Sequence, residues 1–493
     1  MYLTNVWRER PMRRHNQRNA IHSNRQSDRK VMSRLCDYTR NLFRQRRQRR
    51  NEDIHKNAIE SNPQTKAIAK DSMDRYDDNV CQLLLSYLPF EDRFRYEGVS
   101  KQWQRVLYET IDEIVVDHQM VSTMIATETA KYKIFFVKPN GEFFMTSMLN
   151  KCPNIKSIDI RSDADATRVV FKLMFGLKRN YPNLREIQFK NQELDPIWTK
   201  WVFTVFGPMI TRMVINPKCD HIKYINECPK LTTLSTTFLD LMFSPDGQLL
   251  TKNLKALTTN LEVSISDERF STFMDHNLSL QLLVIRIDGI IGSANTVRKM
   301  MAQLSRLSQL KTFAVHINDT HSLGYSLCDS LKTIGQMCGQ LKAFQFKCIQ
   351  YSEYRTEILK SIEFMPHLKQ LYFNGSPFYI TESEGMFESM KGWPQLHHLH
   401  LYSLDINYQL FQQIETNLPK LQRLAICDRK GRINSKCLES LATLSHLKSL
   451  YITNTTEKLR NMRSGLTAIT KKCRKLSSIQ IRDTNGELIY YYS

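Results

Sequence analysis

The sequence predicts an α/β protein in which a small three-helix module precedes a long solenoid of strand and helix repeats. Three observations support this prediction. An Arg-rich polar stretch fills residues 1–73, apolar residues at helical spacing fill 74–115, and a six-residue apolar motif recurs through 151–493. Residues 116–150 fit neither pattern and are assigned to a junction.

The N-terminal stretch carries most of the positive charge of the chain. Residues 1–50 hold 15 Lys or Arg and three acidic residues, so they contribute +12 of the net +21, and the densest run is 44–50. Few apolar residues are available to offset the entropy of ordering, so we expect a disordered tail. A nuclear import signal, a non-specific contact with nucleic acid and a solvated tail without a dedicated role all fit this composition.

The composition argues against several classes of protein. No apolar run approaches the roughly 18 residues of a membrane helix, and the N-terminus has no apolar signal core. The 11 cysteines form no C-x-x-C pair, which favours buried thiols in the cytoplasm or nucleus. Phosphate-binding loops, nucleophile elbows and zinc-protease motifs are missing, so we expect neither an enzyme nor a cofactor.

The helical module begins after residue 74. Its first predicted helix has Asp77 or Asp78 as N-cap and ends before Pro89. One face carries apolar residues spaced i, i+3, i+4, i+7 and i+8, namely Val80, Leu83, Leu84, Tyr87 and Leu88. A short turn through 91–96 follows, and Ser100 caps a last helix on which Trp103, Val106 and Leu107 share a face.

These residues resemble the F-box. The matching positions are an apolar first helix ending in Leu-Pro, a charged turn, and a V-S-K-Q-W end. The F-box opening Leu-Pro is replaced here by residues 76–79. The resemblance implies that the module binds a Skp-family adaptor through Leu84, Leu85, Leu88, Pro89, Val99 and Trp103. The alternative is a helical cap on the solenoid.

The repeating motif has the form apolar-x-x-apolar-x-apolar. Thirteen units begin between Ile155 and Leu476, a mean spacing of about 27 residues, within the period of leucine-rich repeats. Each unit predicts a short strand with its apolar residues inside, followed by a return segment that stacks on its neighbour. Four cysteines lie just before strands, as in the cysteine-containing class of these repeats: Cys152, Cys228, Cys338 and Cys473.

An F-box followed by leucine-rich repeats resembles the substrate receptors of SCF-type cullin-RING ubiquitin ligases. The resemblance implies a Skp-family adaptor and, through it, a cullin scaffold as partners. It also implies a protein target held by the repeats for ubiquitin-dependent degradation, with no chemistry performed by the chain. Two alternatives remain, a scaffold outside any ligase and a nucleic-acid-associated protein that uses the basic tail.

The third, fifth and seventh positions of the repeat motif face away from the core. Tyr372, His400 and Tyr402 are expected to be neighbours there, with Arg423 and Tyr451 one or two strands further on. Tyr and Arg are enriched in binding hot spots, so these five residues are predicted to hold the protein target. An ordinary hydrated sheet face explains the same residues.

The run His397-His398-Leu399-His400 places two imidazoles on one face of a strand. Zinc sites need three or four ligands, and no Cys or carboxylate is placed to complete the set. We therefore expect no metal site.

Overall fold

The computed structural model divides into two units, residues 1–75 and 76–493. The described residues all belong to the second unit, and the predicted tail, Pro89 and nearly all of the predicted junction lie outside them. They are 77–88, 93, 96–116, 151–160, 184–189, 196–215, 220–261, 266–287, 294–317, 324–348, 355–374, 389–402, 408–428 and 431–492.

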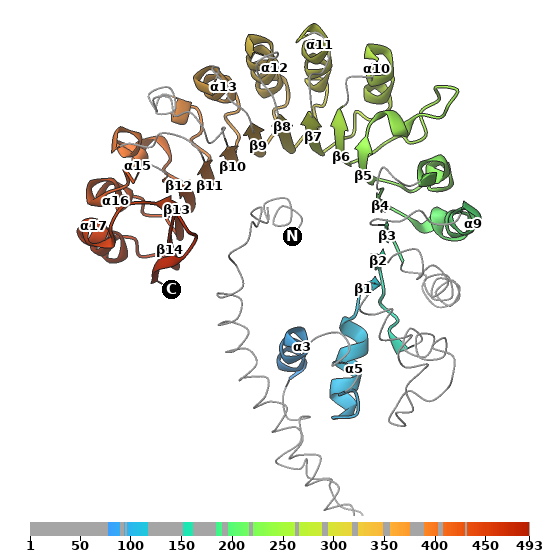
Figure 1. Ribbon diagram of the computed structural model, residues 1–493, viewed down its shortest axis with the longest axis horizontal. Helices are drawn as coiled ribbons and strands as arrows, with labels where there is room; N and C mark the ends of the chain where they lie inside the picture. Colours follow the sequence, from blue (N-terminus) through green and yellow to red (C-terminus); the bar gives the residue numbers. More distant parts are fainter. Residues whose placement is uncertain are drawn as a thin grey trace, which may run out of the picture. The chain divides into compact units, whose positions relative to one another are not determined.

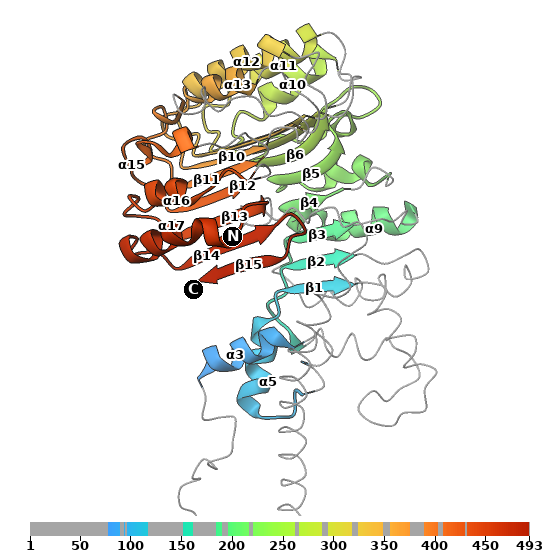
Figure 2. The ribbon, with the colours of Figure 1, turned by 60° about the vertical axis from the view of Figure 1, so that its left-hand side comes forward.

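One sheet of 15 strands runs through this unit, with the strands in sequence order (Figures 1 and 2). Neighbours from β1 to β14 are parallel, and β15 is antiparallel to β14. The strands are β1 (Glu113–Val116), β2 (Ser157–Ile160), β3 (Glu186–Phe189), β4 (Arg212–Val214), β5 (Thr233–Phe238), β6 (Ala256–Leu261), β7 (Leu282–Ile287), β8 (Thr312–Ile317), β9 (Ala343–Cys348), β10 (Gln370–Asn374), β11 (His398–Tyr402), β12 (Arg423–Cys427), β13 (Ser449–Thr455), β14 (Ser478–Asp483) and β15 (Leu488–Tyr492).

Among the described residues, the helices from α9 onward cover one face of this sheet, and the two earlier ones form a separate pair before it (Figures 1 and 2). The pair is α3 (Asp78–Tyr87) and α5 (Lys101–Thr110). The covering helices are α9 (Pro196–Phe206), η3 (Gly207–Met209), η4 (Asp220–Glu227), η5 (Asp240–Met242), α10 (Asp267–His276), α11 (Ala294–Leu304), α12 (Gly324–Met337), α13 (Arg355–Ile362), η6 (Tyr408–Phe411), α15 (Ile414–Asn417), α16 (Ser435–Leu441) and α17 (Leu459–Lys472).

The register of the sheet follows the apolar motif. Leu371, Leu399, Leu424 and Leu450 are direct partners on successive strands, and all four are buried. Every one of the thirteen predicted units has its strand, β2 to β14, including the weak motifs that begin at Leu231 and Leu254. The predicted α/β repeat architecture is therefore confirmed, and the fold is of the leucine-rich-repeat type.

Two strands were not predicted by the motif. β1 precedes the first unit, pairs in register with β2, and spans the boundary placed between residues 115 and 116. β15 follows a turn at Gly486 (φ 81°) and folds back onto β14. β1 carries the six-residue pattern as Ile111, Ile114 and Val116, but these residues fall at the end of the predicted helical module, whereas β15 lacks the pattern.

The described cysteines are free and buried, which confirms the predicted thiols at these nine positions. The thiol of Cys338 lies 3.8 Å from the Leu304 carbonyl oxygen, and that of Cys473 lies 3.5 Å from the Leu444 carbonyl oxygen. Burial raises the pKa of Cys338 to about 11. These neutral thiols donate to carbonyl groups of the preceding repeat and so join neighbouring units.

None of the helices that the structure describes combines the length and the apolar character needed to cross a bilayer.

Candidate functional site

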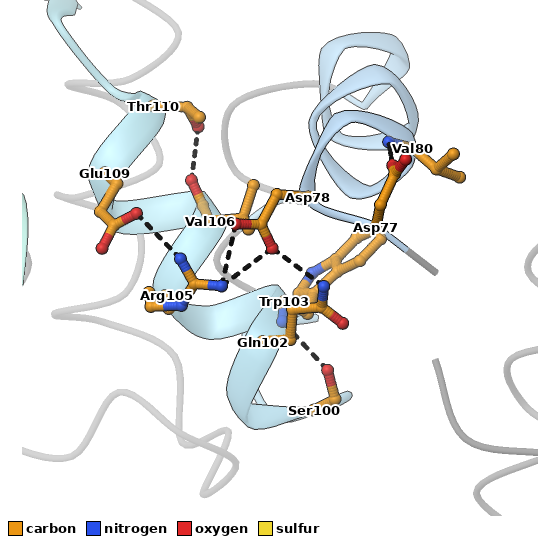
Figure 3. A network of polar contacts seen from close by, with 10 residues as sticks. All are labelled: Asp77, Asp78, Val80, Ser100, Gln102, Trp103, Arg105, Val106, Glu109 and Thr110. Carbon is orange, nitrogen blue, oxygen red and sulfur yellow. Dashed lines mark hydrogen bonds and ion pairs between the residues drawn. The ribbon is translucent and has the colours of Figure 1, made fainter. Parts of the chain in front are cut away.

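Local capping residues define the two helices of the pair. An Asp77 carboxylate oxygen accepts a hydrogen bond from the Val80 backbone N–H at 2.8 Å, and the Ser100 hydroxyl accepts one from the Trp103 N–H at 3.0 Å (Figure 3). α3 ends at Tyr87, with the extended Leu88 as its C-cap. The sequence predicts both caps and this end, because the residue before Pro89 is pushed out of the helical region.

The interior of the pair is formed by one narrow face of each helix. Cys81 and Leu85 of α3 are buried, as are Trp103, Val106 and Leu107 of α5. Leu85 is 2% exposed and Trp103 is 5% exposed. Both side chains belong to the core of the pair in this structure, and their predicted contact with an adaptor stays a prediction.

A polar cluster on the surface fixes α3 against α5 (Figure 3). Asp78 accepts hydrogen bonds from Gln102 at 2.9 Å and from Arg105 at 2.8 Å, and Arg105 also lies 3.3 Å from Glu109. The hydrogen bond from Gln102, followed by that from Arg105, lowers the pKa of Asp78. The cluster is solvated, so it sets the alignment of the helices more than it stabilises them.

The opposite face of α3 presents apolar side chains to solvent. Val80 is 37% exposed, Leu83 is 55% exposed and Tyr87 is 69% exposed, and their spacing of i, i+3 and i+7 places them on one stripe. We call these three residues the α3 stripe. Leu84 and Leu88 border it and are half-buried, and Val99 is also half-buried.

The predicted adaptor residues thus divide into three groups. Leu84, Leu88 and Val99 reach the surface, Leu85 and Trp103 do not, and Pro89 lies outside the described residues. Leu83 and Tyr87 are more exposed than any of these and were not among the predicted adaptor residues. The signal for them was present, since the same periodicity placed them on one face with Leu84.

The pair is tied to the first repeat by a small polar network. The Lys151 ammonium lies 3.2 Å from the Glu97 carboxylate and 5.4 Å from the centre of the Tyr108 ring. The Tyr108 hydroxyl donates to the same carboxylate, and the Asn154 amide donates to the Glu109 carbonyl oxygen at 2.9 Å. These contacts join α5 to the segment before β2.

On the sheet, the predicted target-binding residues lie on the face opposite the helices. Tyr372 of β10 and His400 of β11 are direct register partners, with ring centres 5.9 Å apart. Tyr402 lies 5.4 Å from Tyr372 between ring centres. The structure therefore brings these three rings together, as predicted, and we call them the aromatic cluster.

The other two predicted residues lie beside this cluster. Arg423 pairs in register with His398, and Tyr451 pairs with Ala425, which in turn faces His400. Arg423 is exposed and Tyr451 is half-buried. Tyr372 is only 8% exposed, so it supports the neighbouring rings more than it offers a surface of its own.

The histidines of β11 are neutral at ordinary pH. Burial, together with the neighbouring Arg423, lowers the pKa of His398 and of His400 to about 4. The described surface around the aromatic cluster therefore combines neutral rings with the exposed cation of Arg423. The part of the chain that the structure describes holds no group of three or more His, Cys, Asp or Glu suited to a metal ion.

Comparison with known proteins gives distant structural likeness only. No protein-family model matches the chain, and no curated protein matches it significantly. A solved complex of Rad7 and Elc1 in yeast aligns with 12% identity and a TM-score of 0.41, covering 71% of this chain and 87% of the other. A leucine-rich-repeat protein of Leptospira interrogans aligns with 13% identity and a TM-score of 0.26, covering 68% of this chain and 91% of the other.

Proposed function

We propose that this protein is the non-catalytic substrate receptor of an SCF-type ubiquitin ligase. The α3–α5 pair binds a Skp-family adaptor, which links it to a cullin, and the face of the sheet opposite the helices binds the protein target. The chain contributes proximity between target and ligase, and works in the cytoplasm or nucleus.

The observation that carries the proposal is the α3 stripe. A helix whose exposed face holds Leu83 and Tyr87 leaves apolar surface in water, while its other face is already filled by α5. Such patches on a small module mark protein interaction sites. The F-box resemblance of residues 74–115 names the class of partner.

Co-expression with a Skp-family adaptor followed by size-exclusion chromatography tests this proposal. We expect the wild-type chain to co-elute with the adaptor, and Leu83→Asp and Tyr87→Asp to lose the complex, because each buries a charge in an apolar interface. Gln82→Asp is the matched control, since it adds the same charge to an exposed position of the same helix outside the stripe.

Two results would contradict the proposal. If the wild-type chain elutes alone at micromolar concentrations of both proteins, the pair is a cap on the solenoid and the chain is a scaffold. Equal loss of the complex in Gln82→Asp and Leu83→Asp would show a general effect of charge on α3.

The target-binding half is tested by separating the two surfaces. We expect Arg423→Ser with Tyr451→Ser to lose target proteins in quantitative affinity capture while keeping the adaptor, and Leu83→Asp to do the reverse. Arg and Tyr anchors dominate protein interfaces, and both residues reach the surface beside the aromatic cluster. Ser449 is a neighbouring position, and Ser449→Ala is the control. An unchanged set of captured proteins would reject this surface.

A further inference from the structure

One edge of the sheet carries a continuous row of residues, one from each repeat. Each row residue is the second of its motif, and its backbone N–H donates to the carbonyl oxygen of the row residue in the preceding repeat. For Lys311, Lys342 and Lys369 these N–H···O distances are 2.8 Å from Lys311 to Gln281, 2.8 Å from Lys342 to Lys311 and 2.7 Å from Lys369 to Lys342. These hydrogen bonds fix the backbone positions of the row residues, and the backbones of neighbouring row residues lie about 5 Å apart.

Charge is segregated at this edge. The row and the two-residue turns that precede the motifs hold twelve Lys or Arg residues, against one acid, Asp112, at the start of the row. The whole chain has 70 basic and 49 acidic residues, so its composition does not explain the excess. We call these residues the basic rim: Lys156, Arg185, Lys230, Lys252, Lys255, Lys311, Lys342, Lys369, Lys420, Lys448, Arg474 and Lys475.

The cations of the basic rim are exposed and almost free of carboxylate partners. Lys156, which lies 4.0 Å from Asp112, is the one rim residue within ion-pair distance of a carboxylate among the described residues. Lys311 and Lys420 instead donate to the neutral amides of Gln281 and Gln395, at 3.1 and 2.6 Å. These hydrogen bonds hold the side chains in the row without reducing its charge.

We propose that the basic rim binds the phosphate backbone of duplex nucleic acid, independently of sequence. A continuous row of cations suits a polyanion with regularly spaced charges, and flexible lysine stems adapt to the phosphate spacing of about 3.4 Å per strand along the helix axis. The row begins with Asp112 and otherwise holds Lys, Arg, Thr, Gln, Ser and one His. It offers no Phe, Tyr or Trp on which unpaired bases stack, which favours a duplex over a single strand.

The test measures binding of the full chain to a fluorescein-labelled DNA duplex of 30 base pairs, by anisotropy across a salt series. Lys311→Gln, Lys342→Gln and Lys369→Gln are combined in a rim variant. The control combines Lys200→Gln, Lys360→Gln and Lys436→Gln, which remove the same charge from exposed positions on the covering helices. Both variants keep the basic tail, so its contribution to binding cancels.

We expect the rim variant to bind roughly tenfold or more weakly at low salt. The slope of log K against log salt should become less steep by about 2.7, since each lost phosphate contact removes about 0.9. The single substitution Lys342→Gln should remove about 0.9 of that slope. The control variant should keep the wild-type slope, and all variants should melt at the wild-type temperature.

Equal slopes for the rim and control variants would overturn the proposal, because the tail or diffuse charge would then account for all binding. Polyglutamate that binds as tightly as the duplex, with the same loss in the rim variant, would assign the rim to an acidic protein instead. Neither result bears on adaptor binding through the α3 stripe, so this inference and the proposed receptor function fail or survive separately.

Discussion

The helical pair and the repeat sheet handle their apolar residues in opposite ways. In the sheet, leucines such as Leu399 and Leu424 are buried by the strand before, the strand after and the covering helices. In the pair, one face of α3 meets α5 while the α3 stripe remains exposed. Along most of the sheet the apolar side chains are therefore buried without any partner protein, whereas the pair keeps apolar side chains exposed to solvent.

This difference predicts where substitutions act. Polar substitutions at buried positions of a repeat should lower the free energy of unfolding. Each repeat packs on its neighbours, so a defect in one repeat weakens its contacts with both of them. Polar changes on the α3 stripe leave stability nearly untouched and act on binding. Paired substitutions, one in each region, test this division.

The largest effect is expected for Trp393→Ala in the sheet. Trp393 is fully buried before β11, and its indole N–H donates to the Ile362 carbonyl oxygen at 3.1 Å. Its loss leaves a large cavity and removes one hydrogen bond to this carbonyl oxygen, which still accepts one from the Met365 N–H, so the free energy of unfolding should fall by about 3–5 kcal/mol in a urea titration. Tyr87→Ala, which truncates an aromatic ring that is 69% exposed, should change it by less than about 0.5 kcal/mol. Similar losses in both variants would remove the distinction between the regions.

A second effect depends on pH and belongs to the sheet alone. The pKa of His400 is lowered from 6.5 to about 4 by burial, so between these values the unfolded chain binds more protons than the folded chain. The free energy of unfolding should therefore fall as pH falls from about 6.5 to about 4, by up to about 1.4 kcal/mol per pH unit for this group. Urea titrations at pH 7, 6 and 5 measure the slope, and His400→Gln should reduce it. A wild-type stability that is constant over this window would contradict the burial of this imidazole.

Much of the sheet was predictable, because the spacing of apolar residues determines both strand position and register. Even the weak motifs at Leu231 and Leu254 form β5 and β6, since a strand between two ordered neighbours needs few leucines of its own. The edge strand β15 escaped prediction because its sequence lacks the repeated pattern, and β1 did so because its motif, Ile111, Ile114 and Val116, runs on directly from the predicted last helix of the module.

The sites were less predictable. The spacing of Val80, Leu83 and Tyr87 identifies an apolar face on α3, but the opposite face with Cys81 and Leu85 is also apolar. Periodicity cannot tell which of the two meets α5, so the burial of Leu85 in the pair does not follow from the sequence. The adjacency of Tyr372, His400 and Tyr402 followed from strand register alone, whereas the low exposure of Tyr372 depends on ring packing that a repeat pattern does not encode.

The smallest expected effect compares one helix cap in each region. Ser100 caps α5 and Asn434 caps α16, each by accepting a hydrogen bond from a backbone N–H of the first turn, at 3.0 and 3.3 Å. Replacing either by Ala should weaken its helix by about 1 kcal/mol.

In α16 the neighbouring repeats hold the helix in place, so amide hydrogen exchange should change little beyond its first turn. In α5 the small core of the pair offers less support, so Ser100→Ala should speed exchange along the whole helix, and Ser100→Thr should restore protection. Binding of the proposed adaptor should slow exchange in α5 again, because a partner on the α3 stripe would stabilise the folded pair. If exchange speeds up only in the first turn of both α5 and α16, the pair is as stable locally as the repeats. Its exposed apolar face would then not reflect an incomplete core.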